Sequence, residues 1–182
     1  MYIIPFERSY WVIPGRVLAG EIPSSLNNET RINKLQHLLN LKIDVVINLM
    51  ESNEKTFTGE LLVDYIPELK ALSDKRNHEI IVKRFPIKDL QIPTIELMKE
   101  ILQFLKKCVD ENKKVYIHCW GGVGRTGTVV GCFLQDNGCV TSENVIEMIT
   151  YLKRTTSIVN RDSPETKEQM DFVKNWIQKS KL

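Results

Sequence analysis

Apolar residues along this chain alternate between short continuous runs and longer stretches in which they recur every three or four positions. Residues 44–50 (DVVINLM) are apolar and rich in β-branched side chains, which is typical of a buried strand. Residues 30–41 carry isoleucine and leucine at helical spacing and predict an amphipathic helix. By the same criteria, strands are predicted over residues 17–19, 80–85 and 114–118, and helices over residues 58–72, 93–109 and 128–135.

Two serines are predicted to begin the remaining helices. Ser142 precedes the apolar stretch 145–154, and its hydroxyl can accept a hydrogen bond from the first free amides of a helix. Ser163 precedes Pro164, and proline is tolerated in a first helical turn because its missing N–H has no partner there. We therefore expect Ser142 and Ser163 to be N-caps.

The order of the predicted elements decides the fold class. Strands that alternate with helices favour one sheet with helices packed on its faces. We therefore predict an α/β fold with a central, mostly parallel sheet of about four to five strands, flanked by helices on both faces. A chain of 182 residues has room for one domain of ordinary size, so we predict a single domain over residues 1–182.

Composition supports a folded chain and argues against several classes of protein. Hydrophobic residues make up 42% and charged residues 26%, which suits a core with a polar surface. A net charge of +2 lacks the basic excess typical of proteins that bind nucleic acid through its phosphates. No apolar run approaches the roughly 18 residues of a membrane span, and the N-terminus lacks the features of a secretory signal. We expect a cytoplasmic monomer that binds neither nucleic acid nor membranes.

The four cysteines follow no familiar framework. Cys108, Cys119, Cys132 and Cys139 are separated by 11, 13 and 7 residues, and none belongs to a CxxC pair. This spacing argues against both a zinc site and a disulfide scaffold. We expect no metal and no cofactor, and we interpret Cys108, Cys132 and Cys139 as buried or semi-buried thiols.

Cys119 differs because it lies in a glycine-rich segment between a predicted strand and a predicted helix. Residues 118–127 read HCWGGVGRTG. Glycines let a backbone turn its amides inward, and free N–H groups at the start of a helix bind anions together with the helix dipole. The segment therefore predicts an anion site, and three phosphate-related interpretations compete for it.

Two of these interpretations do not fit the sequence. Gly122, Gly124 and Gly127 match the dinucleotide pattern GxGxxG, but no returning parallel strand with an acidic residue follows about 20 residues later. A Walker A loop fails at two positions. Arg125 replaces its lysine, and Cys119 stands where its opening glycine belongs.

The third interpretation rests on Cys119 and Arg125, which have five residues between them. A loop of that length can wrap a tetrahedral oxyanion, with the thiolate below the phosphorus and the guanidinium on two oxygens. The loop amides, the helix dipole and Arg125 stabilise the thiolate form of Cys119, which makes it a strong nucleophile. We assign His118 to loop support through a hydrogen bond to the backbone, although a plain strand-end role fits equally well.

The same segment resembles the signature HCxxGxxR[ST]G of the cysteine-dependent protein tyrosine and dual-specificity phosphatases. The match consists of His118, Cys119, Gly122, Arg125, Thr126 and Gly127. Residues 17–23 (VLAGEIP) and 161–169 (RDSPETKEQ) are similar to further segments of these enzymes, so the resemblance covers most of the chain. It implies a compact, single-domain phosphatase with the fold of the phosphotyrosine protein phosphatases.

The resemblance also implies a two-step reaction through a phosphocysteine. Cys119 would be the nucleophile, Arg125 would bind phosphate and stabilise the transition state, and the Thr126 hydroxyl would ease departure of the sulfur. Water would then hydrolyse the intermediate. The implied phosphate-binding residues are Trp120, Gly121, Gly122, Val123, Gly124 and Arg125.

This reaction requires an acid that protonates the leaving oxygen. Asp89 lies thirty residues before Cys119, between two prolines in FPIKDLQIPT (85–94), and the segment resembles the P-I-x-D loop of compact members of the family. The resemblance implies that Asp89 is this acid. The alternative is an aspartate that only supports a turn or caps a helix. Glu96 is a poorer candidate because it lies inside the following predicted helix.

Two further residues have two interpretations each. The resemblance implies that Gln169 positions the hydrolytic water, whereas a glutamine on a surface helix is the plain alternative. Trp120 either packs beneath the loop or lines the mouth of the pocket and stacks on an aryl substrate. Neither choice follows from the sequence.

We therefore expect a metal-independent phosphomonoester hydrolase that acts on phosphotyrosine and, as a wider specificity, on phosphoserine and phosphothreonine. Its partner would be a phosphoprotein or phosphopeptide substrate. Two alternatives stay open: a pseudophosphatase that recognises phosphate without turnover, and a phosphatase for a non-protein phosphoester. The loop lacks the lysines found in phosphoinositide phosphatases of the superfamily, which argues against an inositol head group.

Overall fold

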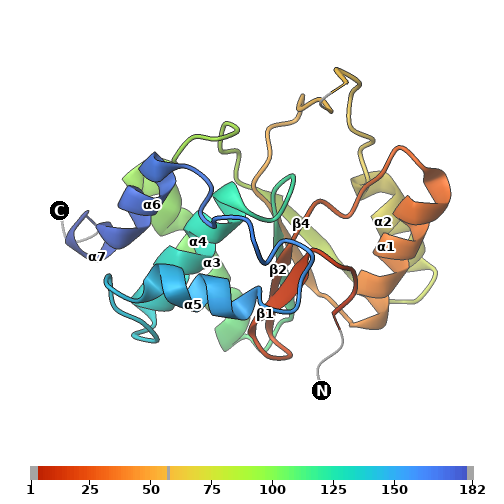
Figure 1. The fold of residues 1–182 in the computed structure, drawn as a ribbon. Helices are drawn as coiled ribbons and strands as arrows, with labels where there is room; N and C mark the ends of the chain where they lie inside the picture. The colour runs from red at the N-terminus through yellow and green to blue at the C-terminus, as the bar shows by residue number, and fades with distance from the viewer. Residues whose placement is uncertain (1–3, 57, 180–182) are drawn as a thin grey trace.

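Five strands form one sheet within residues 4–56 and 58–179, the part of the chain that the computed structural model describes (Figure 1). The strands are β1 (Ser9–Ile13), β2 (Val17–Gly20), β3 (Val45–Asn48), β4 (Ile81–Arg84) and β5 (Val115–His118). Their order across the sheet is β1-β2-β5-β3-β4. β1 runs antiparallel to β2, and all other neighbours are parallel. The predicted mostly parallel sheet is confirmed.

Helices cover both faces of this sheet, as predicted. They are α1 (Asn28–Asn40), α2 (Ile66–Asp74), α3 (Ile95–Asp110), α4 (Gly124–Asp136), α5 (Val145–Leu152), α6 (Lys167–Lys174) and α7 (Trp176–Lys179). Figure 1 shows α1 and α2 on one face and α3 to α7 on the other. Among the described residues, no helix has both the length and the apolar character needed to cross a membrane.

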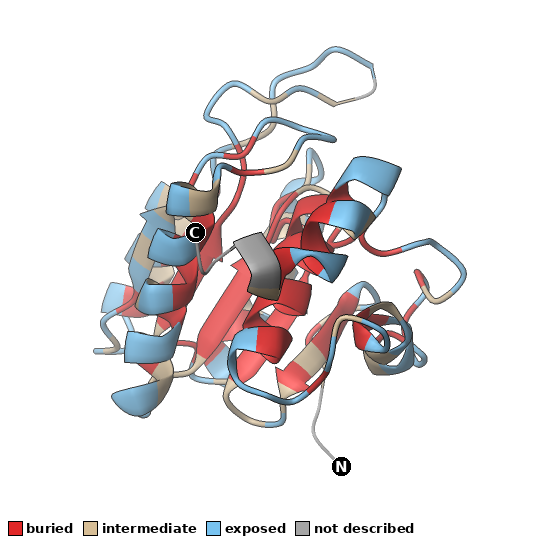
Figure 2. Ribbon diagram, turned by 90° about the vertical axis from the view of Figure 1, so that its left-hand side faces the viewer, coloured by how far each residue is buried: buried red, intermediate tan, exposed pale blue. Residues whose placement is uncertain are grey.

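The burial of a strand explains whether it could be predicted from the sequence. β2, β3 and β5 are buried along their whole length because helices cover both of their faces, and such strands read as continuous apolar runs. Figure 2 shows this buried layer of the sheet beneath helices whose outer sides are exposed. β1 escapes prediction because a bulge between Trp11 and Ile13 interrupts the alternation of its side chains at the edge of the sheet.

The helix predicted over residues 58–72 is wrong in its first half. α2 begins only at Ile66, and Pro67 lies in its first turn, so the proline marks the start of the helix instead of its end. Upstream, the Thr58 hydroxyl donates to the Glu60 carboxylate over 2.9 Å. Side chains such as threonine compete with a helix in this way because they bond to nearby groups in turns.

Both predicted serine caps are also wrong. The Ser142 hydroxyl donates to Oε1 of Gln135 over 3.1 Å, and the N-cap of α5 is Asn144. The Ser163 hydroxyl donates to the Val123 carbonyl over 2.8 Å, and α6 begins later with a capping box formed by Thr166 and Gln169. Each serine uses its hydroxyl for a tertiary contact, which local sequence does not reveal.

The cysteine predictions need one correction. All four cysteines are free, and Cys108 and Cys132 are buried in α3 and α4 as expected. Cys139 is exposed, because it follows the turn at Gly138 that leaves α4, in a run of exposed residues. The predicted domain limits, residues 1–182, include ends that lie outside the described residues.

The sheet brings three connections together. β3, β4 and β5 are parallel, and the register pairs Asn48 with both Arg84 and His118 at their carboxyl ends. The connections that follow these strands carry Glu54, Asp89 and Cys119 respectively. Ligands of open α/β sheets bind at the carboxyl ends of the strands, so these connections define the place to examine for a site.

Candidate active site

The loop between β5 and α4 forms the floor of a pocket of about 390 Å³. Cys119 begins this loop directly after the strand, and its side chain is only 3% exposed. The lining residues are Arg8, Lys55, Asp89, Leu90, Cys119, Trp120, Gly121, Val123, Gly124, Arg125, Arg161, Glu165 and Gln169. Three residues predicted for catalysis at widely separated positions, Cys119, Asp89 and Gln169, thus face one cavity.

Close approach to a neighbouring strand sets the shape of the loop. Gly122 has a φ of 70°, and a Cβ built on it would lie 2.4 Å from the carbonyl carbon of Gly20. The Ile22 amide donates to the Trp120 carbonyl over 2.9 Å and holds the same two segments together. Only glycine combines this left-handed backbone with this contact, so Gly122 is a structural requirement of the loop.

The start of α4 supplies positive potential to the pocket. α4 begins at Gly124, and no side chain caps its first amides. Uncapped N–H groups and the positive end of the helix dipole attract anions. The helix begins four residues earlier than the predicted residue 128, because the glycine-rich segment itself continues into helix.

Arg125 is buried to 1% exposure and is held by three groups from other connections. Its Nη1 and Nη2 atoms pair with both carboxylate oxygens of Glu54, the Nη2 contact measuring 2.9 Å. Nη1 also donates to the Ile87 carbonyl over 3.0 Å. Nη2 lies 2.9 Å from Oδ1 of Asp89, whose side chain is 62% exposed. The guanidinium is therefore rigidly placed, with one exposed and replaceable partner.

The environment of Arg125 keeps it charged. Burial by itself lowers the pKa of the guanidinium, but the Glu54 hydrogen bonds and the charges of Cys119, Glu54 and Asp89 outweigh burial and raise that pKa. A buried cation needs such pairing, because an isolated charge in an apolar interior is strongly unfavourable. The bidentate geometry also suits the planar fork of arginine better than lysine.

His118 supports the loop from behind. Its Nδ1 donates to the Cys119 carbonyl over 3.0 Å, so its Nε2 accepts the hydrogen bond from the Tyr65 hydroxyl at 2.7 Å. Burial, assisted by the charges of Arg84 and Arg125, lowers the pKa of His118 to about 3. The ring is therefore neutral at pH 7. It bonds to the loop backbone, which is the geometry predicted for loop support.

Thr126 lies directly after Arg125, in the first turn of α4. Its side chain is fully buried, and its Oγ1 atom has no hydrogen-bond partner among the described residues. A buried hydroxyl without a partner is unfavourable by roughly 1–3 kcal/mol. The Thr126 hydroxyl is therefore a candidate donor to an acceptor that is present only during a reaction.

Gln169 is not a surface residue. It is fully buried at the start of α6, where its Oε1 accepts from the amides of Glu165 and Thr166 over 3.1 and 3.2 Å. Its Nε2 donates to the Gln91 carbonyl over 3.1 Å. A Cβ built on Gly124 would lie 2.9 Å from the Gln169 Oε1 atom, so this amide lies over the loop. The plain surface alternative for Gln169 is therefore excluded.

Trp120 fits both interpretations, packing against the core and lining the pocket. The side chain is half-buried and packs against the core, and it also lines the pocket that contains Cys119. Together with Leu90 and Val123 it gives this pocket an apolar wall.

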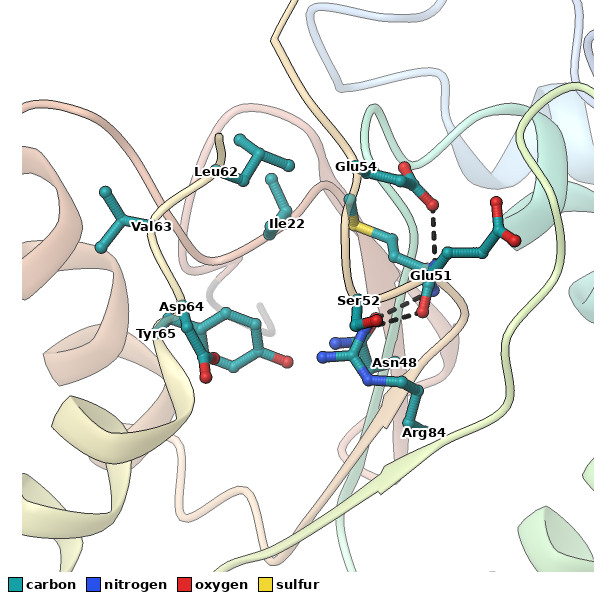
Figure 3. A pocket seen from close by; sticks show the side chains of 11 residues that line it. Ile22, Asn48, Glu51, Ser52, Glu54, Leu62, Val63, Asp64, Tyr65 and Arg84 are labelled. Carbon is teal, nitrogen blue, oxygen red and sulfur yellow. Dashed lines mark hydrogen bonds between the residues drawn. The ribbon is translucent and has the colours of Figure 1, made fainter. Parts of the chain in front are cut away.

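Glu54 is a residue beside the pocket that sequence analysis missed. Its carboxylate accepts from the Glu51 amide over 2.9 Å and from Arg125, so its own turn and the guanidinium hold it from two sides. Figure 3 shows it on the wall of a smaller pocket of about 120 Å³, whose lining also includes Tyr65 and Arg84. The one feature of the sequence that could have indicated Glu54 is an acidic turn directly after a buried strand. In the described part of the chain, no group of three or more His, Cys, Asp or Glu side chains could hold a metal ion.

Comparison with known proteins relates this chain to phosphatases. A family model described as "Polymorphic toxin system, DSP-PTPase phosphatase" matches residues 23–139. This span is more than half of the chain. It includes the segment with Asp89 and the whole loop from Cys119 to Arg125.

Several similar proteins of known sequence match about half of the chain. The uncharacterized protein MJECL20 of Methanocaldococcus jannaschii is 37% identical over 94 residues, which are 52% of this chain and 58% of that protein. Cyclin-dependent kinase inhibitor 3 of Sus scrofa is 38% identical over 103 residues, which are 55% of this chain and 47% of that protein. The chain thus spans about half the length of the curated relatives it matches.

Solved structures match the fold over almost the whole chain. Tk-PTP in its active form is 24% identical with a TM-score of 0.65, and the match covers 96% of this chain and 97% of that one. Kinase associated phosphatase with a serine in place of its catalytic cysteine is 17% identical with a TM-score of 0.73, covering 100% and 98%. The predicted phosphotyrosine protein phosphatase-like fold is confirmed.

The close contact between Gly122 and Gly20 predicts that alanine lowers stability at position 122 and not at position 121. Gly122→Ala should lower the free energy of unfolding by about 2–4 kcal/mol, because it adds both backbone strain and a clash with Gly20. Gly121→Ala is the matched control, since its nearest built contacts are 3.6 and 4.0 Å and the expected change is within about 1 kcal/mol. Urea denaturation measures both, and equal losses would contradict the proposed packing.

The neutral state of His118 predicts a pH dependence of stability. Its pKa is lowered from 6.5 to about 3, so the stability it contributes is complete above pH 6.5 and is lost as the pH falls toward 3. Between about pH 6 and about pH 4, the wild type should lose up to about 1.4 kcal/mol per pH unit more than His118→Asn. His37→Asn, at an exposed position, is the control and should keep the wild-type slope. Parallel curves for wild type and His118→Asn would contradict burial of a neutral ring.

Proposed function

The chain belongs to the DSP-PTPase phosphatase family, and on this premise we propose that it dephosphorylates phosphotyrosine in proteins through a cysteinyl-phosphate intermediate. The observation that carries the proposal is the meeting of Cys119, Arg125 and Asp89 in one pocket at the uncapped start of α4. A nucleophile, a phosphate-binding cation and an acid are the groups that phosphomonoester hydrolysis requires.

In the first step, the Cys119 thiolate attacks phosphorus and the bond to the leaving oxygen breaks. Asp89 gives its proton to that oxygen, so the alcohol or phenol leaves neutral. The exposed Asp89 carboxyl is free to turn toward the leaving group when substrate phosphate takes its place on Nη2 of Arg125. Glu54 keeps its own bonds to Arg125 and holds the guanidinium in position throughout.

In the second step, water attacks the phosphocysteine and the sulfur leaves as thiolate. Asp89 now takes a proton from the water, which restores the starting state. We assign donation to the departing sulfur to the Thr126 hydroxyl, which has no partner among the described residues. The Gln169 amide over Gly124 supports a role in positioning the water.

Two features support phosphotyrosine as the preferred group. Cys119 is only 3% exposed at the floor of the pocket, which favours a long side chain that reaches it. Trp120, Leu90 and Val123 line the same pocket and suit an aromatic ring. A wider specificity would include phosphoserine and phosphothreonine as substrates. The reaction as proposed needs no metal, because the helix start and Arg125 stabilise the phosphoryl charge and Cys119 is itself the nucleophile.

Hydrolysis of p-nitrophenyl phosphate in EDTA tests the proposed reaction. The wild type should turn over, and Cys119→Ser should lose at least about 1,000-fold in kcat, because an unactivated hydroxyl is a far weaker nucleophile. Cys132→Ser, in the helix that follows, is the matched control and should retain turnover. A pseudophosphatase would show no wild-type turnover, and an active Cys119→Ser protein would contradict the assigned nucleophile.

A comparison of two carboxylates tests which of them is the acid. Asp89→Asn should lower kcat/KM by about 100-fold for phenyl phosphate, a poor leaving group, and much less for p-nitrophenyl phosphate. It should also abolish the fall of activity on the basic side of the pH profile. Glu54→Gln should lower kcat/KM by the same factor for both substrates, because Glu54 acts by holding Arg125. A dependence on the leaving group in Glu54→Gln alone would reverse the assignment.

A further inference from the structure

The connection between α5 and α6 lies directly against the first turn of α4, where the loop from Cys119 to Arg125 ends. A Cβ built on Gly127 would lie 2.3 Å from the Ser163 Oγ atom and 3.2 Å from the Pro164 backbone nitrogen. Glycine at position 127 therefore lets the connection approach the backbone of α4 closely. The proposed reaction gives this part of the connection no role.

Ser163 makes a direct hydrogen bond to the loop. It is 1% exposed, and its Oγ atom donates to the Val123 carbonyl over 2.8 Å. The Gly127 amide donates to the same carbonyl over 3.0 Å. In a planar trans peptide, the carbonyl and the following N–H point in opposite directions. Ser163 therefore directs the Gly124 amide, which belongs to the same peptide group, away from itself. Gly124 lines the catalytic pocket, and no side chain caps this start of α4.

A buried lysine holds the connection that carries Ser163. Lys153 directly follows α5 and is fully buried. Its Nζ atom donates to the Arg161 carbonyl and, over 3.4 Å, to the Ile158 carbonyl. Its own carbonyl accepts from the Thr156 hydroxyl over 2.7 Å. One side chain thus joins the end of α5 to the residues that immediately precede Ser163.

The charge of Lys153 does not contribute to an ion pair within the described part of the chain. Burial lowers the pKa of this lysine, and the charge of Asp162 offsets only part of that effect. An apolar side chain would avoid the desolvation of a buried ammonium group. What only the ammonium group provides is a fixed position for the carbonyls of Ile158 and Arg161.

From these contacts we propose that Lys153 is a positioning residue of the loop from Cys119 to Arg125. Its ammonium group fixes the connection that carries Ser163, and Ser163 sets the direction of the Gly124 amide toward the oxygens of a bound phosphoryl group. The inference rests on the proposed function of the pocket. A preset amide strengthens the binding of a tetrahedral oxyanion, because the loop does not have to reorganise when the anion arrives.

Binding of inorganic tungstate, a tetrahedral oxyanion, tests this proposal without depending on turnover. Isothermal titration calorimetry measures Kd for the wild type, Ser163→Ala and Lys153→Met. Each substitution should raise Kd by about five- to tenfold, because one hydrogen bond from the loop to the anion loses its direction.

Two variants are matched controls for these measurements. Ser142→Ala removes a serine hydroxyl that bonds to Gln135, outside the pocket. Lys167→Met removes a positive charge from the exposed first turn of α6. Both controls should keep the Kd for tungstate within about twofold of the wild-type value.

The double variant Lys153→Met with Ser163→Ala separates an action through Ser163 from an independent effect. Substitutions of residues that act in series are not additive. The double variant should therefore bind tungstate no more than about twofold more weakly than Ser163→Ala alone. Independent effects would multiply to about 25-fold or more, and that result would overturn the proposal.

A Lys153→Met protein that unfolds at lower urea concentration, yet binds tungstate as the wild type does, would show a purely structural lysine and overturn the proposal. If Lys153→Met does not fold, Lys153→Gln decides, because its amide can donate to one of the two carbonyls. Its Kd should rise by about two- to fivefold, and an unchanged Kd would count against the proposal. Turnover of p-nitrophenyl phosphate by the wild type is measured separately. Its absence would refute the proposed reaction, whereas the tungstate affinities would still decide the role of Lys153.

Discussion

The burial of one guanidinium constrains the rest of this molecule. Arg125 is 1% exposed, and a cation in that position is tolerated only while carboxylates and carbonyls satisfy it. Glu54 follows β3 and Ile87 follows β4, so the charge ties together the connections that leave adjacent parallel strands. Removing one partner of such a buried pair typically lowers stability by about 3–5 kcal/mol. The same pairing that stabilises the fold also directs the guanidinium toward the pocket.

Backbone geometry, more than side-chain chemistry, shapes the rest of the loop from Cys119 to Arg125. Gly122 lies against Gly20, and the Ile22 amide bonds to the Trp120 carbonyl, so the loop takes its curvature from the strand beside it. His118 holds the loop from the opposite side through the Cys119 carbonyl. The amides at the start of α4 are therefore fixed in direction before any ligand arrives, which reduces the reorganisation that anion binding requires.

Charge is distributed unevenly in this nearly neutral chain. The net charge is only +2, yet Arg8, Lys55, Arg125 and Arg161 all line one pocket. The acidic members of that pocket, Asp89 and Glu165, are paired with two of these arginines. Basic side chains are thus concentrated at the pocket that contains Cys119, and a low net charge of the whole chain is compatible with a positive potential at one cavity.

The sequence by itself determined the α/β class, most strands and the loop from Cys119 to Arg125, because periodicity and the spacing within one loop are local properties. The sequence also pointed to Asp89, through the resemblance of its segment to a known loop, and the structure places this residue in the pocket that contains Cys119. Only the tertiary structure decided the positions of Glu54 and Arg161 and the burial of Gln169. Glu54 is 71 residues from Arg125 in sequence, and the two meet because parallel strands end at the same edge of the sheet. Pairing across that edge depends on strand order and register, which no local pattern encodes.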